Sequence, residues 1–324
     1  MTNFQVYKKT LGFSFIRILV GLCSFAILAG LTVAGFFIAD GNFDSRGLIG
    51  ALVGFLISLI PVFLIDFFIA NKVKAAQISM MSKGVVEGNL PEHTIKAGFD
   101  DVKGRFGRIA TYYLITRAIK GIFHQISRVI NKLGTAIGGD VGNGITSAIN
   151  SAVEILIGFL CDCCLGWIIY RKDVNPFRAG CEGCVIFFKH GKALIRNIGR
   201  IFGMGFLSLL IIGGTFFGLS YLAFYMNPAI CEGLVREFME IAARDGGVPP
   251  EIFMNPFYVS LMFSAAIAVI FFLSLHSILV RPFILVGVLR NYMNAGLAKI
   301  PTESEFNEVA AKSPKFRKLQ SRIQ

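Results

Sequence analysis

Four long runs of residues without a charged side chain restrict the fold of this chain more than any other feature of its sequence. They cover residues 18–39, 47–65, 201–231 and 252–280. A helix needs about 20 apolar residues to cross the roughly 30 Å hydrocarbon core of a membrane, so each run can form one crossing. A fifth run, 145–170, is also long enough, although it contains Glu154 and Asp162. The runs predict an all-α, polytopic membrane protein.

The composition agrees with a membrane protein. The chain is 54% hydrophobic and 16% charged, whereas soluble domains carry about 25% charged residues. The first run is longer than the apolar core of about 7–15 residues in a cleavable signal peptide, so we expect it to remain as a first span. The net charge of +12 is typical of a membrane protein whose basic loops stay in the cytoplasm. We therefore expect no nucleic-acid partner.

The distribution of basic residues sets the number of crossings. Five spans would place the basic segment 171–200 and the basic C-terminal tail outside the cell. A further span over 107–131 returns both to the cytoplasm, and it leaves the nearly neutral segment 132–144 and the acidic segment 227–251 outside. The sequence thus predicts six transmembrane helices in three hairpins, with basic amphipathic cytoplasmic segments. The spans cover about 16–39, 47–70, 107–131, 145–170, 201–225 and 256–280.

The six spans form one integral membrane domain over residues 1–324, which ends in a basic cytoplasmic tail over 301–324. We expect a multi-pass protein of the cell membrane with both termini in the cytoplasm. Small residues spaced for close helix packing occur at Gly50 and Gly54 and again at Gly214 and Gly218. The tripeptide Gly-Arg-Ile precedes the third and the fifth span, at 107–109 and 199–201, which raises the possibility of a repeated hairpin.

The third predicted span carries a stripe of basic residues. Arg117, Lys120, His124 and Arg128 recur at helical spacing and share one face, while isoleucines occupy the opposite face. An Arg or Lys that faces lipid at the membrane centre costs about 2.5–3.5 kcal/mol. The stripe must then face protein, water or an opposite charge, and the next span supplies Glu154 and Asp162.

These six residues are the predicted substrate-binding site, in a polar cleft between the third and fourth spans. We expect Glu154 near Lys120 or His124, and Asp162 nearer Arg117. The alternative is a helix that lies flat on the membrane with its basic residues among the lipid headgroups, because a sharply amphipathic basic helix is typical of that arrangement.

Other motifs indicate no chemistry. Cys161, Cys163 and Cys164 end the fourth span and are followed by Cys181 and Cys184. Four thiolates resemble a zinc site, but this position at the end of an apolar span favours packing or palmitoylation, and its reducing location argues against disulfides. No nucleotide-binding loop, catalytic dyad or metalloprotease helix is present. We expect no metal, no cofactor and no enzymatic activity.

From about residue 104 onward, the order of features resembles the C-terminal half of the choline transporter-like family. The resembling stretches are Cys161-Asp-Cys-Cys-Leu165, Phe187-Phe188, Ile195-Arg-Asn197, the long last span with its continuation to Tyr292, and Ala310-Ala-Lys-Ser-Pro-Lys-Phe316. The resemblance implies transport of choline or a related amine, or a lipid-associated role. The chain lacks the large extracellular loop of that family, and no functional residue is carried over.

Three functions follow from these patterns. The first is a transporter-like protein that moves a small organic solute or a lipid headgroup through the polar cleft. The second is an oligomeric channel that conducts anions along the basic stripe. The third is a membrane scaffold or assembly subunit without transport. Expected partners are membrane lipids, a small solute, a second copy of the chain or another membrane protein.

Overall fold

The chain is almost entirely helical. The computed structural model describes residues 1–39, 45–106, 114–125, 143–195, 198–244 and 250–323, and these contain helices and turns but no strand. They divide into two compact units. Unit 1 comprises Met1–Ile198 and Leu285–Gln324, and unit 2 comprises Gly199–Ile284.

Four helices in the described part of the chain are long and apolar enough to cross a membrane: Asn3–Ile38, Ile49–Val86, Gly199–Met226 and Pro256–Ala298. Their large apolar side chains are exposed, including Phe25 at 68% and Ile60 at 64%, as expected for surfaces that face lipid. The prediction of an all-α chain with membrane-spanning helices is thereby confirmed for four candidate spans. The predicted count of six spans in three hairpins stays a prediction. The runs 107–131 and 145–170 are not among them, and residues 107–113 and 126–131 lie outside the described residues.

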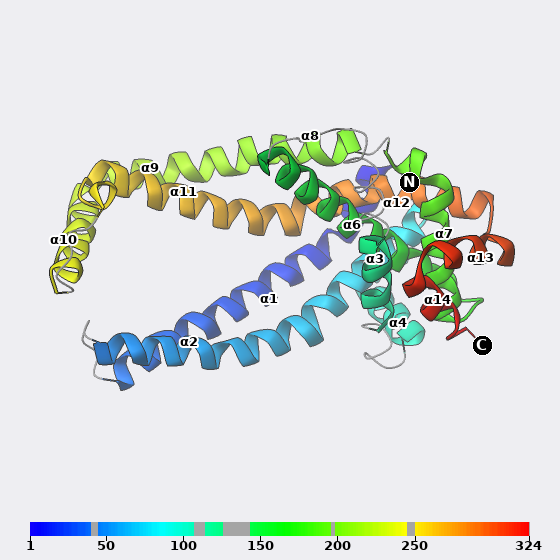
Figure 1. Ribbon diagram of the computed structural model, residues 1–324, viewed down its shortest axis with the longest axis horizontal. Coiled ribbons are helices and arrows are strands. Elements are labelled where there is room, and N and C mark those ends of the chain that lie inside the picture. The colour runs from blue at the N-terminus through cyan, green and yellow to red at the C-terminus, as the bar shows by residue number, and fades with distance from the viewer. Residues whose placement is uncertain (40–44, 107–113, 126–142, 196–197, 245–249, 324) are drawn as a thin grey trace. The chain divides into compact units, whose positions relative to one another are not determined.

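The first hairpin pairs α1 (Asn3–Ile38) with α2 (Ser45–Ile65), which lie side by side in Figure 1. Three glycines allow the two backbones to touch. A Cβ atom on Gly54 would lie 2.2 Å from the carbonyl oxygen of Leu31, and one on Gly35 would lie 2.3 Å from that of Gly50. The predicted packing role of Gly50 and Gly54 is therefore confirmed.

The second apolar helix of this hairpin continues into the remainder of unit 1. α2 passes through a five-residue π-helix, η1 (Asp66–Ala70), into α3 (Asn71–Val86), and a turn then leads to α4 (Thr94–Phe106). α3 packs on the first turns of α1, where the Gln77 amide donates to the Ser14 hydroxyl at 3.1 Å. Phe13, Met80 and Met81 are fully buried around this contact.

We call the remaining helical body of unit 1 the head, which consists of α3, α4 and the elements that pack with them. These elements are the helix over 114–125, α6 (Asn143–Tyr170), α7 (Pro176–Ile195), residues 285–298 of α12 (Arg281–Ala298), α13 (Glu303–Lys312) and α14 (Pro314–Gln320). Its largest fully buried side chains are those of Trp167, Tyr292, Phe123, Phe306 and Phe316. The predicted tail over 301–324 thus contributes two of these five core aromatics, and α13 and α14 fold into the head.

Unit 2 contains the second hairpin. α8 (Ile198–Ser208) continues through the π-helix η2 (Leu209–Gly213) into α9 (Gly214–Met226), and the return helix is α11 (Pro256–Leu275), followed by η4 (His276–Val280). Phe216 stacks on Phe271 with ring centroids 4.2 Å apart. Between the two helices lie α10 (Pro228–Arg244) and the short η3 (Glu251–Phe253). Gly214 and Gly218 have no atom within 4 Å of a Cβ position among the described residues, so this hairpin does not use them for packing.

Candidate functional site

The helix over 114–125 turns its apolar face into the head. Ile115, Ile119, Ile122 and Phe123 are each 0–2% exposed. The Phe123 ring meets Phe187 of α7 edge to face at 5.1 Å. Arg117 and Lys120, on the other face, are exposed. The predicted amphipathic pattern is therefore present, and the apolar face is covered by protein.

The end of the same helix contacts the C-terminal segment of the chain. The side-chain oxygen of Gln125 accepts a hydrogen bond from the Ser313 hydroxyl at 3.0 Å and another from the backbone N–H of Lys315 at 3.4 Å. The Lys315 ammonium also lies 3.2 Å from a Cβ position on Gly121. These contacts join the helix to α14, so the described part of the third predicted span belongs to the head.

Charged side chains of α3, α6 and the helix over 114–125 form ion pairs in the head. The Lys74 ammonium of α3 lies 2.5 Å from the Asp162 carboxylate of α6. His124 Nδ1 lies 3.1 Å from the Glu154 carboxylate, which is eight residues earlier in α6. Lys74 and Lys120 both interact electrostatically with Cys161. We call Lys74, Lys120, His124, Glu154 and Asp162 the charged band.

The structure brings some of the predicted site residues together and separates others. His124 and Glu154 are in contact, as the predicted arrangement allowed. Asp162 pairs with Lys74, a residue outside the predicted set, instead of meeting Arg117. Arg128 lies outside the described residues. The side chains of Glu154 and His124 are 57% and 26% exposed, so this pair is accessible at the surface of unit 1.

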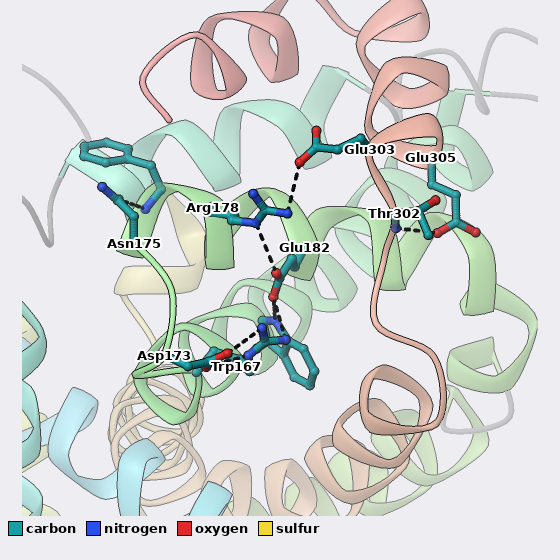
Figure 2. A network of polar contacts seen from close by, with 10 residues as sticks. Trp167, Asp173, Asn175, Arg178, Glu182, Thr302, Glu303 and Glu305 are labelled. Carbon is teal, nitrogen blue, oxygen red and sulfur yellow. Dashed lines mark hydrogen bonds and ion pairs between the residues drawn. The ribbon is translucent and has the colours of Figure 1, made fainter. Parts of the chain in front are cut away.

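A second charged network is buried in the head, and the sequence analysis missed it. Glu182 of α7 is 1% exposed and accepts a hydrogen bond from the Trp167 indole N–H at 3.0 Å. Arg171 lies 3.1 Å from the same carboxylate, and Arg178 reaches from Glu182 to Glu303 of α13 at 3.0 Å. Figure 2 shows Trp167, Glu182 and Glu303 converging from three elements. The network ties α6, α7 and α13 together.

The ionisation of Glu182 reflects two opposing influences. Burial raises the pKa of Glu182, whereas the Trp167 hydrogen bond and the charges of Arg171 and Arg178 act to lower it. The balance leaves its pKa above the ordinary value of 4.5. The spacing of Arg178 and Glu182, four residues apart on one helix, was the only signal in the sequence for this contact.

Asp101 of α4 is the centre of a third charged cluster. Its carboxylate lies 2.5 Å from the Lys172 ammonium and 2.7 Å from that of Lys83, and it accepts a hydrogen bond from the Ser79 hydroxyl at 2.9 Å. Burial tends to raise the pKa of Asp101, but these hydrogen bonds outweigh burial and hold the pKa below its ordinary value of 3.8. The cluster joins α3, α4 and the turn after α6.

The cysteines of α6 and α7 are packed in the head as free thiols. Cys163, Cys164, Cys181 and Cys184 are buried and unbridged. Hydrogen bonding to Cys164, together with burial, raises the pKa of Cys184 well above its ordinary value, which keeps the residue as a thiol. Among the described residues, no group of three or more His, Cys, Asp or Glu side chains could hold a metal ion.

Comparison of the chain with models of protein families, with curated proteins and with solved structures finds no match. The resemblance to the choline transporter-like family therefore rests on the sequence patterns alone.

Proposed function

We propose that the protein is a membrane-anchored scaffold or assembly subunit whose head presents a basic surface to an acidic segment of a partner protein. The observation that carries the proposal is the orientation of the helix over 114–125. Its isoleucines are buried in the head, while Arg117 and Lys120 are exposed. Two exposed basic residues on one face of a helix attract an acidic partner and suppress binding of basic ones.

The proposed topology has four spans, with the head and both termini in the cytoplasm of a cell-membrane protein. Four crossings place the basic segments in the cytoplasm as well as six crossings do. An even number of crossings between two basic segments returns the chain to the same side of the membrane. The basic segments 71–106, 171–200 and 281–324 then lie on one side. The acidic residues Glu232, Glu237 and Glu240 of α10 lie on the other.

Partner capture by crosslinking tests this proposal. A photoreactive residue in place of Leu114, which is exposed one turn before Arg117, should capture a defined partner in cells. In the double variant Arg117→Gln/Lys120→Gln, the yield of that crosslink should fall at least about tenfold, since two charge contacts contribute more than about 1.4 kcal/mol of binding free energy. Lys103→Gln is the matched control, because Lys103 is an exposed lysine of α4 in the same head. An equal yield in the double variant and the control would contradict the proposal.

A second candidate is the transporter-like function, in which a small organic solute or a lipid headgroup binds at the charged band. The contact of His124 with Glu154 favours it, because this accessible pair joins the two helices that were predicted to line the polar cleft. In this case purified protein in liposomes should take up solute, and Glu154→Gln should reduce the rate without loss of folded protein. A channel would instead give anion-selective current in planar bilayers. Absence of both flux and current in vesicles that contain folded protein would leave the scaffold function.

A further inference from the structure

Two stretches of the chain repeat one order of structural elements. In the first, the apolar helix α2 continues through the π-helix η1 into α3, and a turn at Leu90-Pro91 leads to α4. In the second, α11 continues through the π-helix η4 into α12, and a turn at Ile300-Pro301 leads to α13. Asp66 is the first residue of η1 and His276 is the first residue of η4. These two residues are separated by the same number of positions as Pro91 and Pro301.

The buried faces of the two apolar helices follow the same displacement. α2 buries small residues at every fourth position, and so does α11. The residues are Gly50, Gly54 and Ser58 in α2, and Ser260, Ser264 and Ala268 in α11. In unit 2 this face meets α9, where the Ser220 hydroxyl donates to the Ser264 carbonyl at 3.5 Å. The two stretches therefore match in the order of their elements and in the size, spacing and burial of these small residues. We treat them as two copies of one structural module.

The π-helix at the centre of each copy is poorly packed. Neither η1 nor η4 contains a buried residue. The head helices that follow are well packed, with Ala75 and Ala76 of α3 and Val286 and Leu289 of α12 at 0% exposure. Each π-helix thus connects a well-packed head helix with an apolar helix whose side chains are mostly exposed. A segment with few buried contacts has lower local stability than the packed helix that it joins. π-Helices make up well under 1% of residues in proteins, so two at equivalent positions indicate a function.

The chain provides two further indications that these segments are distinct from the helices around them. In η1, the Asn71 side-chain amide donates to the backbone carbonyl of Asp66 at 3.0 Å, which supports the widened turn. In the second copy, the division between the two compact units falls at Ile284, four residues after η4. The third π-helix, η2, lies within the apolar hairpin of unit 2 and buries Gly213, so it does not share these properties.

We propose that η1 and η4 are equivalent joints. At each joint, the apolar helix of a membrane hairpin shifts its helical register relative to the head helix that continues from it. A π-helix closes i→i+5 hydrogen bonds and therefore contains one residue more than an α-helix of the same path. Exchange between i→i+5 and i→i+4 bonds moves the wide turn along the helix without breaking its continuity. This device is independent of the scaffold function proposed above.

Hydrogen–deuterium exchange of the full chain in lipid nanodiscs tests the joints. We expect backbone amides at residues 70–75 and 280–285 to exchange at least about tenfold faster than those in the middle of α3 and α12. Deletion of Phe68 or of Ile278 removes the additional residue of one joint. Each deletion should slow exchange at its own joint to the rate of the neighbouring helix and leave the other joint unchanged.

A matched deletion separates this effect from general damage. Deletion of Leu56, in the uninterrupted part of α2, rotates the residues on one side of it by 100° relative to the other, so it should disrupt the hairpin and reduce the yield of folded protein. Exchange at both joints as slow as in the neighbouring helices of the unaltered chain would overturn the proposal, even if the deletions fail to fold. Unchanged exchange after the Phe68 and Ile278 deletions would also overturn it.

Discussion

Replacement of Gly54 by alanine should destabilise the first hairpin, because the new methyl group meets backbone and not a flexible side chain. Its Cβ would lie 2.2 Å from the Leu31 carbonyl oxygen, whereas ordinary contact begins at 3.4 Å. The helices α1 and α2 would have to separate by roughly 1 Å, which forfeits a quarter to a half of the dispersion energy across the contact. Overpacking of this kind costs about 1–3 kcal/mol.

The control is Gly30→Ala on α1, where no atom lies within 4 Å of the Cβ position. This variant gains only the helix propensity of alanine, up to about 1 kcal/mol. We expect thermal unfolding in detergent, followed by far-ultraviolet circular dichroism, to show a midpoint several degrees lower for Gly54→Ala and equal or higher for Gly30→Ala. Equal midpoints for the two variants would refute the close approach of α1 and α2.

Two further predictions concern the head. Because the folded-state pKa of Asp101 lies below its ordinary value of 3.8, its stabilisation is complete above that pH and is lost as the pH falls through the folded-state value. Asp101→Asn should therefore lower stability by about 2 kcal/mol at pH 7 and reduce the loss of stability on acidification, which urea titrations at several pH values would measure. Glu182→Ala should cost about 3–5 kcal/mol, because Arg171 and Trp167 lose a buried partner. The fluorescence of Trp167, the single tryptophan, should shift to the red, whereas Glu303→Gln, at an exposed partner, should leave it almost unchanged.

The sequence predicted the membrane-crossing part of the fold well and the head poorly. Uncharged runs of sufficient length identify spans regardless of what packs on them, so the four candidate spans coincide with the four runs. The amphipathic pattern of the helix over 114–125 was also correct, but the pattern does not say whether the isoleucines meet lipid or protein. In the structure Ile115 and Ile119 lie beside Gly180 of α7. A count of five spans leaves two basic segments outside the cell, and one span fewer returns both to the cytoplasm just as one span more does.

The charged contacts of the head could not be read from the sequence because they join segments far apart in the chain. Lys74, Asp101 and Glu182 all lie in segments with the composition of basic, solvated loops. Their partners, Asp162, Lys172 and Trp167 respectively, become neighbours only when the helices pack. The expected turn between the two helices predicted Glu154 near Lys120 or His124 and Asp162 nearer Arg117. Glu154 does contact His124, whereas Asp162 pairs with Lys74.

The number of spans is tested most directly by the sidedness of Thr135, which lies in the segment 126–142, outside the described residues. A single cysteine at this position, in a chain whose seven native cysteines are replaced, would be treated on intact cells with a membrane-impermeant maleimide. A second chain with a single cysteine in place of Glu232 of α10 serves as the external control. Four spans predict that the Glu232→Cys chain is labelled and that the Thr135→Cys chain is labelled only after the membrane is opened. Labelling of Thr135→Cys on intact cells would establish a third crossing and contradict the placement of the 114–125 helix in a cytoplasmic head.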